Sequence, residues 1–181
     1  MTRTKQPRSK RAGSNRGRRG AAMVEAGMWI PVLVLLMMGM FWIGNITYTY
    51  YILRKTLWTA GSYVSSQQGV DFCNAGDPAV SGAINLAITG AGVDPGTNPI
   101  LPNLTSDMIS MSIERLDPTS GVPSICDCSL TGCDTNLGGG EPDFVVVMIP
   151  GGYPILPVIP GVALSGPILL NPIVRVPFGG T

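Results

Sequence analysis

The sequence predicts an α+β protein, with one long N-terminal transmembrane helix followed by a small, mainly β C-terminal domain rich in Gly and Pro. Three observations support this prediction. No charged residue occurs between Ala26 and Leu53, and an apolar run of this length can cross a bilayer as a helix. A strongly basic segment precedes that run. Residues 71–181 contain 16 Gly and 14 Pro, a density that excludes long helices and favours short strands joined by turns.

The basic segment, residues 1–20, is expected to be disordered and cytoplasmic. It holds eight of the 12 Lys and Arg residues and no Asp or Glu, whereas the remainder holds four basic and all 11 acidic residues. With almost no apolar side chains, this segment cannot bury a core. Basic residues beside a membrane helix stay in the cytoplasm. Arg54 and Lys55, on the far side of the apolar run, are a weaker opposing signal. The eight basic residues outweigh them, so the C-terminal domain is expected outside the cytoplasm.

The apolar run itself has the features of a membrane helix that continues beyond the bilayer. Trp29 and Trp42 lie near its two ends, as in an interfacial aromatic belt. Pro31 interrupts the run, but membrane helices tolerate proline. Beyond the run, apolar residues recur at helical spacing and predict one buried face: Leu53, Leu57, Ala60 and Val64. We expect helix from about Ala21 to about Gln68, ended by Gly69.

Short elements are expected in the C-terminal domain. Asp77-Pro78 predicts the start of a helix that reaches about Thr89. Alternation predicts a half-buried strand over residues 109–114, and the β-branched run at 144–149 predicts a more buried one. Two further strands, at 162–170 and 173–176, are limited to edges or breaks by Pro167, Pro172 and Pro177.

The start of the apolar helix carries a lone carboxylate, Glu25, within the stretch RRGAAMVE of residues 18–25. A carboxylate at this position needs a partner or a function. In one interpretation it lies in the headgroup layer, where the helix dipole favours a negative side chain. In the other, the chain is cut after Gly20, and the new amine of Ala21 lies one helical turn from Glu25. Pairing would then offset much of the desolvation cost of both groups.

These residues resemble a known family. Type IV prepilins have a short basic leader that ends in Gly, a glutamate at the fifth mature position and an apolar helix. RGAAMVE at 19–25, Pro31 and the apolar run at 32–38 resemble more closely the TadE-like proteins, pseudopilins of the tight-adherence (Tad or Flp) type IVb pilus systems. The resemblance covers about residues 18–60.

The resemblance implies a minor pilin or pseudopilin of the bacterial inner membrane that contributes to pilus biogenesis, adhesion or secretion. Prepilin peptidase would cut between Gly20 and Ala21, and Glu25 would guide assembly with other pilin or pseudopilin subunits in the lipid bilayer. The expected organisation is therefore a cleaved leader at 1–20, a transmembrane helix with an amphipathic extension at 21–69, and an extracytoplasmic domain at 70–181.

Four cysteines lie in the expected outer domain: Cys73, Cys126, Cys128 and Cys133. An even number of cysteines outside the cytoplasm predicts two disulfides. Cys126 and Cys128 are too close for an easy mutual bridge, so one of them is expected to pair with Cys73, and the sequence does not say which. A zinc site formed by all four is the alternative, but we predict no metal.

Several other classes of function are not supported by the sequence. The chain contains no His, the commonest general base and metal ligand, and no catalytic constellation is visible, so we predict no enzyme and no cofactor. The scattered acidic residues are expected to form turns; calcium binding by Asp127, Asp134, Glu141 and Asp143 lacks EF-hand spacing. The basic head adjoins a membrane helix, so we expect no nucleic-acid partner. The alternative function is an uncleaved single-pass protein whose outer domain binds a ligand or an envelope partner.

Overall fold

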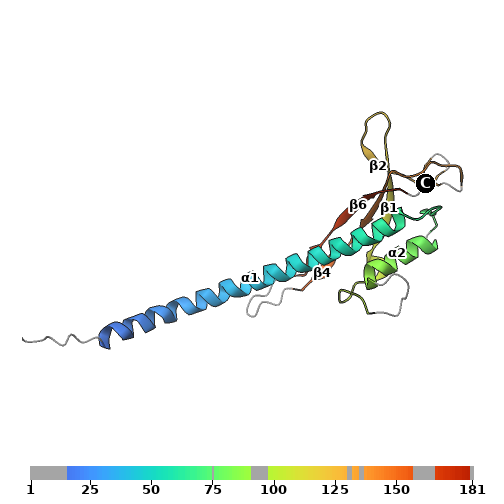
Figure 1. The fold of residues 1–181 in the computed structure, drawn as a ribbon. Coiled ribbons are helices and arrows are strands. Elements are labelled where there is room, and N and C mark those ends of the chain that lie inside the picture. Colours follow the sequence, from blue (N-terminus) through green and yellow to red (C-terminus); the bar gives the residue numbers. More distant parts are fainter. Residues whose placement is uncertain are drawn as a thin grey trace, which may run out of the picture. The chain divides into compact units, whose positions relative to one another are not determined.

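The computed structural model describes residues 16–74, 76–90, 98–129, 132–134, 137–156 and 166–179, with only the backbone at 16–19, 21 and 22. It contains two compact units, one that ends at Trp42 and one that begins at Ile43. Helix α1 (Arg16–Ser65) supplies the described part of the first unit and continues into the second (Figure 1). A small β domain follows it, so the predicted α+β class is confirmed.

Both ends of α1 differ from the sequence-based expectation. The helix begins at Arg16 instead of Ala21, so residues 16–20, expected to be disordered, are helical. Extension of an existing helix needs no new nucleus, and Arg is a good helix former. The helix ends at Ser65 instead of Gln68, because the amides of the next two residues bond to carbonyls three residues back and tighten the last turn. Gly69 then turns the chain with a φ of 67°.

A four-stranded antiparallel sheet has the order β2-β1-β3-β6. Its strands are β1 (Ser110–Leu116), β2 (Pro123–Ile125), β3 (Phe144–Met148) and β6 (Ile173–Pro177). The strands predicted at 109–114, 144–149 and 173–176 are thus confirmed. Strand β6 lies at the sheet edge, with Pro172 before it and Pro177 as its last residue, the positions at which a sheet tolerates proline.

Two strands form a separate hairpin. β4 (Tyr153–Ile155) pairs antiparallel with β5 (Ile168–Leu170). The sequence predicted a strand over 162–170. The structure shows its last three residues as β5, and 162–165 lie outside the described residues.

Helix α2 (Pro78–Thr89) follows α1 and is capped at both ends. The start at Asp77-Pro78 and the end at Thr89 were predicted from the sequence. The Asp77 carboxylate accepts hydrogen bonds from the Ala79 amide at 2.8 Å and the Val80 amide at 3.4 Å. These bonds satisfy amides that have no partner inside the helix. Gly90, with a φ of 71°, ends α2 and donates to the Leu86 carbonyl. A turn of 3₁₀ helix, Ser106–Met108, leads into β1.

The core of the second unit lies between α1, α2 and the sheet. The predicted helix face is buried, with relative exposures of 0–1% for Leu53, Leu57, Ala60 and Val64. These residues share one apolar cluster with members of α2, β3 and β6: Ala83, Ala87, Val145, Val147, Val174 and Val176. At Gly61 the helix backbone comes so close to the sheet that an added Cβ would lie 2.9 Å from Cγ2 of Val176. The C-terminal part of α1 is therefore a core element of the domain.

Candidate functional site

The candidate site is the first part of α1, where an apolar helix carries one carboxylate. Over residues Met23–Ser65 the helix is long and apolar enough to cross a membrane, with a mean hydropathy of 2.0 in its most apolar window. None of that window is buried within the molecule. Large apolar side chains such as Met28 (78% exposed) and Phe41 (80% exposed) face outward. A helix that is apolar all round requires a lipid or protein environment, so this one fits a single-pass membrane protein.

Hydroxyl groups at the far end of the apolar run find partners within the helix. Thr47 Oγ1 donates to the Ile43 carbonyl and Thr49 Oγ1 to the Asn45 carbonyl, both at 2.9 Å. These bonds lower the cost of placing the two hydroxyls beside lipid. Tyr48 and Tyr51 are 65% and 64% exposed, so aromatic side chains project outward just past the run. Such residues are typical of a membrane–water interface.

Glu25 lies at the head of the apolar run with its side chain exposed. Among the described residues it has no hydrogen-bonding or ionic partner. Since α1 is helical from Arg16, Ala21 and Glu25 occupy positions four apart on one helix face. The spacing that the sequence predicted is therefore present in the structure.

Gly20 and Ala21 also lie inside helix α1. The peptide bond between them is consequently part of a hydrogen-bonded backbone. A Gly in a helix interior costs about 1 kcal/mol relative to Ala, so this is a weak point of the helix. An added Cβ at Gly20, Gly27, Gly39 or Gly44 would meet no other atom within 4 Å. The glycine positions of the span thus leave room for the close approach of another helix.

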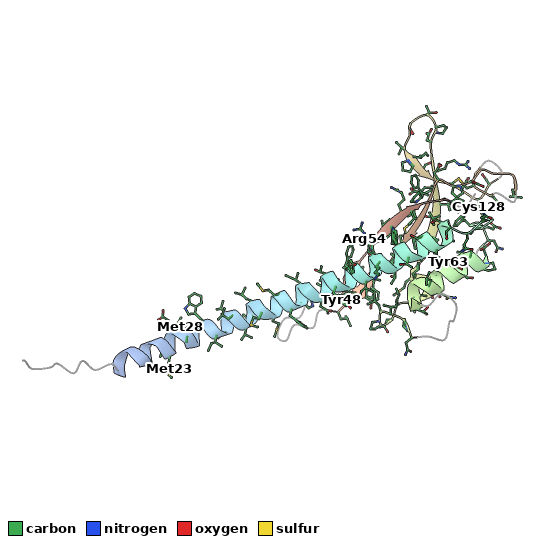
Figure 2. The ribbon with its side chains drawn as sticks, in the orientation of Figure 1. Met23, Met28, Tyr48, Arg54, Tyr63 and Cys128 are labelled. Atoms are coloured by element: carbon green, nitrogen blue, oxygen red, sulfur yellow. A yellow bond between two sulfur atoms is a disulfide. The ribbon has the colours of Figure 1, made fainter. Side chains whose placement is uncertain are left out.

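The four cysteines form two disulfides in the second unit. Cys73 pairs with Cys128, with 5.5 Å between their Cα atoms, and Cys126 pairs with Cys133, with 5.7 Å. Cys73 thus pairs with one of the two closely spaced cysteines, as expected. The sequence left open which of the two it is, and the structure shows that it is Cys128. The first disulfide joins the segment after α1 to the loop after β2 (Figure 2, which labels Cys128). With all four sulfurs in disulfides, none is a thiolate ligand in this structure.

Acidic side chains in the second unit hold turns and strand ends. The Asp71 carboxylate accepts from the Cys73 amide at 2.9 Å, and that of Asp143 accepts from the Leu116 amide at 2.7 Å. Asp117 accepts from the amides of Thr119 and Ser120 in the β1–β2 turn, and these bonds lower its pKa below its ordinary value. Within the described residues, no group of three or more acidic, Cys or His side chains is arranged to hold a metal ion. Asp94, another of the scattered acidic residues that are expected to form turns, lies outside the described residues.

Glu114 and Arg175 form an ion pair across the sheet that the sequence did not indicate. Arg175 Nε lies 2.7 Å from Oε2 of Glu114, and its Nη2 donates to Oε1 at 3.0 Å. The hydrogen bond and the opposite charge raise the pKa of Arg175. Because the two residues belong to β1 and β6, on either side of β3, their pairing supports the strand order.

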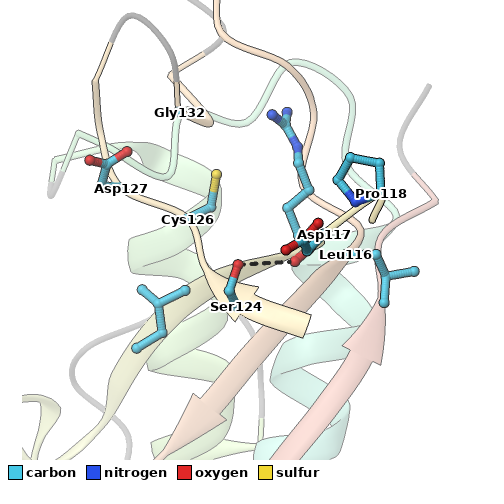
Figure 3. A pocket seen from close by; sticks show the side chains of 9 residues that line it. Leu116, Asp117, Pro118, Ser124, Cys126, Asp127 and Gly132 are labelled. Atoms are coloured by element: carbon cyan, nitrogen blue, oxygen red, sulfur yellow. Dashed lines mark hydrogen bonds between the residues drawn. The ribbon is translucent and has the colours of Figure 1, made fainter. Parts of the chain in front are cut away.

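A hollow of about 290 Å³ lies beside the end of β1 and the disulfide loop (Figure 3). Arg115, one of its lining residues, donates to the Glu141 carbonyl from Nη2 at 2.9 Å and from Nε at 3.2 Å. Ser124 Oγ donates to the Arg115 carbonyl at 3.5 Å, and Asp117 binds turn amides. These polar groups therefore make their hydrogen bonds within the local structure.

Comparison with known proteins finds a match in the first part of the chain. Residues 20–57 match the family model described as TadE-like protein. The match begins at Gly20, includes Glu25 and the apolar run, and ends at the buried Leu57. No curated protein and no solved structure matches the chain.

Proposed function

We propose that this chain, which carries a TadE-like segment at residues 20–57, is a minor pilin or pseudopilin of a Tad/Flp-type pilus, assembled through its N-terminal helix. One observation carries the proposal: the Glu25 carboxylate is exposed on an apolar helix and has no partner among the described residues. Such a group is costly beside hydrocarbon. Cleavage after Gly20 would create an amine at Ala21, one turn away.

That amine can neutralise Glu25 within one chain or between two neighbouring subunits. Pairing between subunits would give the carboxylate a partner only in the assembled state, and therefore would favour assembly. The apolar helix that follows Glu25, none of whose most apolar part is buried, supplies the surface for such packing. Prepilin peptidase, other pilin subunits and the lipid bilayer are accordingly the proposed partners.

The orientation follows from charge and cysteine chemistry. Eight basic residues precede the apolar run, which favours a cytoplasmic N-terminus. Two disulfides in the second unit suit an oxidising compartment. We therefore place the chain in the bacterial inner membrane with its domain on the periplasmic or extracellular side, where it would serve pilus biogenesis, adhesion or secretion.

The cleavage step is tested by the mass of the protein purified from membranes. We expect a mature chain that begins at Ala21. Because the Gly20–Ala21 bond lies within a helix, the peptidase must open that turn, and Gly20→Leu should block processing by filling the peptidase site and by raising local helix propensity. Gly27→Leu, at another unobstructed glycine of the same helix, is the control and should be processed normally. A full-length mature chain in the wild type would refute the cleavage step.

The role of Glu25 is tested by three substitutions. Glu25→Ala and the isosteric, uncharged Glu25→Gln should be processed and inserted but should enter sheared pilus fractions poorly. Glu25→Asp should retain part of the assembly, because it keeps the charge. Met28→Ala removes a neighbouring exposed side chain (78% exposed) and serves as the matched control. Wild-type assembly of Glu25→Gln would remove the proposed role of the carboxylate.

A ligand-binding outer domain on an uncleaved membrane anchor is the second candidate function. It is favoured by a hollow of about 680 Å³ beside the Cys73–Cys128 disulfide, with apolar walls that include Phe72, Ile84 and Met111. The mass measurement separates the two candidates, because only this second one predicts that residues 1–20 remain on the mature chain.

A further inference from the structure

The outward face of the β4–β5 hairpin is apolar. Tyr153 and Ile155 point into the core with exposures of 6% and 9%. The alternate side chains, Pro154, Leu156 and Leu169, are exposed, with Leu156 at 73% and Leu169 at 54%. An antiparallel hairpin with one face on a core normally has a polar second face. Here no charged residue occurs anywhere between Phe144 and Val174.

The end of β4 lies beside the part of α1 that directly follows the apolar run. A hollow of about 370 Å³ is lined on one side by Asn45, Tyr48 and Thr49 and on the other by residues 153–156 and 101–103. Tyr153 Oη donates to the Pro102 carbonyl at 2.6 Å and fixes the hairpin to that neighbouring turn. Figure 2 labels Tyr48 on this part of the helix.

The distance along the helix sets the level of this hairpin relative to a bilayer. The run ends at Gly44, and Thr49 follows it by about 7.5 Å at a rise of about 1.5 Å per residue. The headgroup region on each side of a bilayer is about 5–8 Å thick. Gly44, Asn45 to Thr49 and the hairpin end all belong to the second unit. Where Gly44 lies at the edge of the hydrocarbon, the hairpin end is therefore within the depth of the headgroup layer.

We propose that the outward face of the β4–β5 hairpin, formed by Pro154, Leu156 and Leu169, is a second membrane contact that rests in the interfacial layer of the bilayer. Lipid is the occupant because the face is continuous with the point at which α1 leaves the membrane and carries no charge. Burial of this face offsets the cost of exposing large apolar side chains to water. The inference rests on α1 crossing a membrane and is independent of cleavage and of pilus assembly.

Photochemical crosslinking in vesicles tests the proposal on the full chain. Benzoylphenylalanine replaces Leu156 or Leu169, the protein is reconstituted in phosphatidylcholine vesicles that contain an alkyne-tagged phospholipid, and lipid adducts are counted after illumination. The control position is Ile125, which is 74% exposed. It lies on β2, the edge strand of the main sheet opposite β6. Leu36 within the apolar run reports whether α1 itself is in lipid.

The expected result is lipid labelling at Leu36, Leu156 and Leu169 that exceeds labelling at Ile125 several-fold. Labelling of Leu156 and Leu169 at the Ile125 level, with Leu36 labelled, would overturn this inference alone. Crosslinked dimers instead of lipid adducts would show that a second copy of the chain contacts this face, and would also overturn the inference. Absence of labelling at Leu36 would overturn the membrane span and, with it, the proposed function.

A charge substitution provides an independent test on the same face. Leu156→Asp should leave the fold intact because the side chain is exposed, and should lower lipid labelling from a photoreactive residue at Leu169 several-fold. Ile125→Asp is the matched control and should leave that labelling unchanged. Equal labelling in both variants would contradict a lipid contact at the hairpin.

Discussion

Gly61 is a position at which a small substitution should disturb the packing of α1 against the sheet. It lies in α1 where the helix backbone approaches β3 and β6. An added Cβ would be 2.9 Å from Cγ2 of Val176 and 3.3 Å from Cγ2 of Val147. Both valines are buried, with exposures of 6% and 0%, and β-branched side chains have little rotamer freedom with which to move aside. We therefore choose Gly61→Val as the perturbation.

Two opposing terms determine the size of the effect. Replacing Gly by Val within a helix gains about 0.3 kcal/mol of intrinsic propensity. Forcing extra methyl groups into a packed core costs about 1–3 kcal/mol. The net loss of unfolding free energy is then about 2 kcal/mol, which corresponds to a fall in Tm of roughly 4–8 °C for a chain of this size.

The assay is thermal unfolding of the full chain in detergent micelles with its disulfides intact. Near-ultraviolet circular dichroism is the suitable signal, because it follows tertiary packing, whereas the span can stay helical in micelles after the domain unfolds. Gly44→Val, in the same helix but with no atom within 4 Å of the added Cβ, is the control and should change Tm little. Equal Tm values for the two variants would refute the packing of α1 against the sheet.

Three further predictions concern the same domain. Serine substitution of both members of the Cys73–Cys128 disulfide, which spans 55 residues, should cost about 4 kcal/mol in a urea titration, against about 2 kcal/mol for Cys126–Cys133, if chain entropy dominates. Leu57→Ala should cost about 2–5 kcal/mol by the same measurement, whereas Leu36→Ala, at an exposed position, should change the midpoint little. Amide hydrogen bonds lower the pKa of Asp117 below its ordinary value. Its contribution to stability is therefore present above the pKa of an unfolded aspartate and is lost as the pH falls through the lower, folded pKa. An NMR titration in which those amides report a pKa no lower than that of an aspartate in an unfolded peptide would contradict this.

The parts of the fold that local sequence patterns determine were predictable. The helix face of Leu53, Leu57, Ala60 and Val64 follows from a helical period, and the Asp77 cap of α2 follows from a local hydrogen bond. The apolar run and its lone carboxylate also required no knowledge of the fold, because lipid imposes a simple condition on composition.

The missed features depend on contacts between distant segments. Gly61 carries no signal of its own, because the residues that exclude a side chain there, Val147 and Val176, come from strands far along the chain. The pairing of Cys73 with Cys128 likewise depends on how the loop after β2 approaches the end of α1. The apolar face of the β4–β5 hairpin was obscured by the frequent prolines of that region, which weaken an alternating pattern.

Since one helix supplies both the apolar span and a wall of the domain core, the point at which the chain is cut decides whether a water-soluble piece survives. A fragment that starts at residue 70 would leave Val145 and Val147 facing water, because their partners on α1 are gone. A fragment that starts near Ile43 would retain the α1 residues that cover these valines. Any protease that releases this domain in folded form must therefore cut near Ile43, at the end of the apolar run.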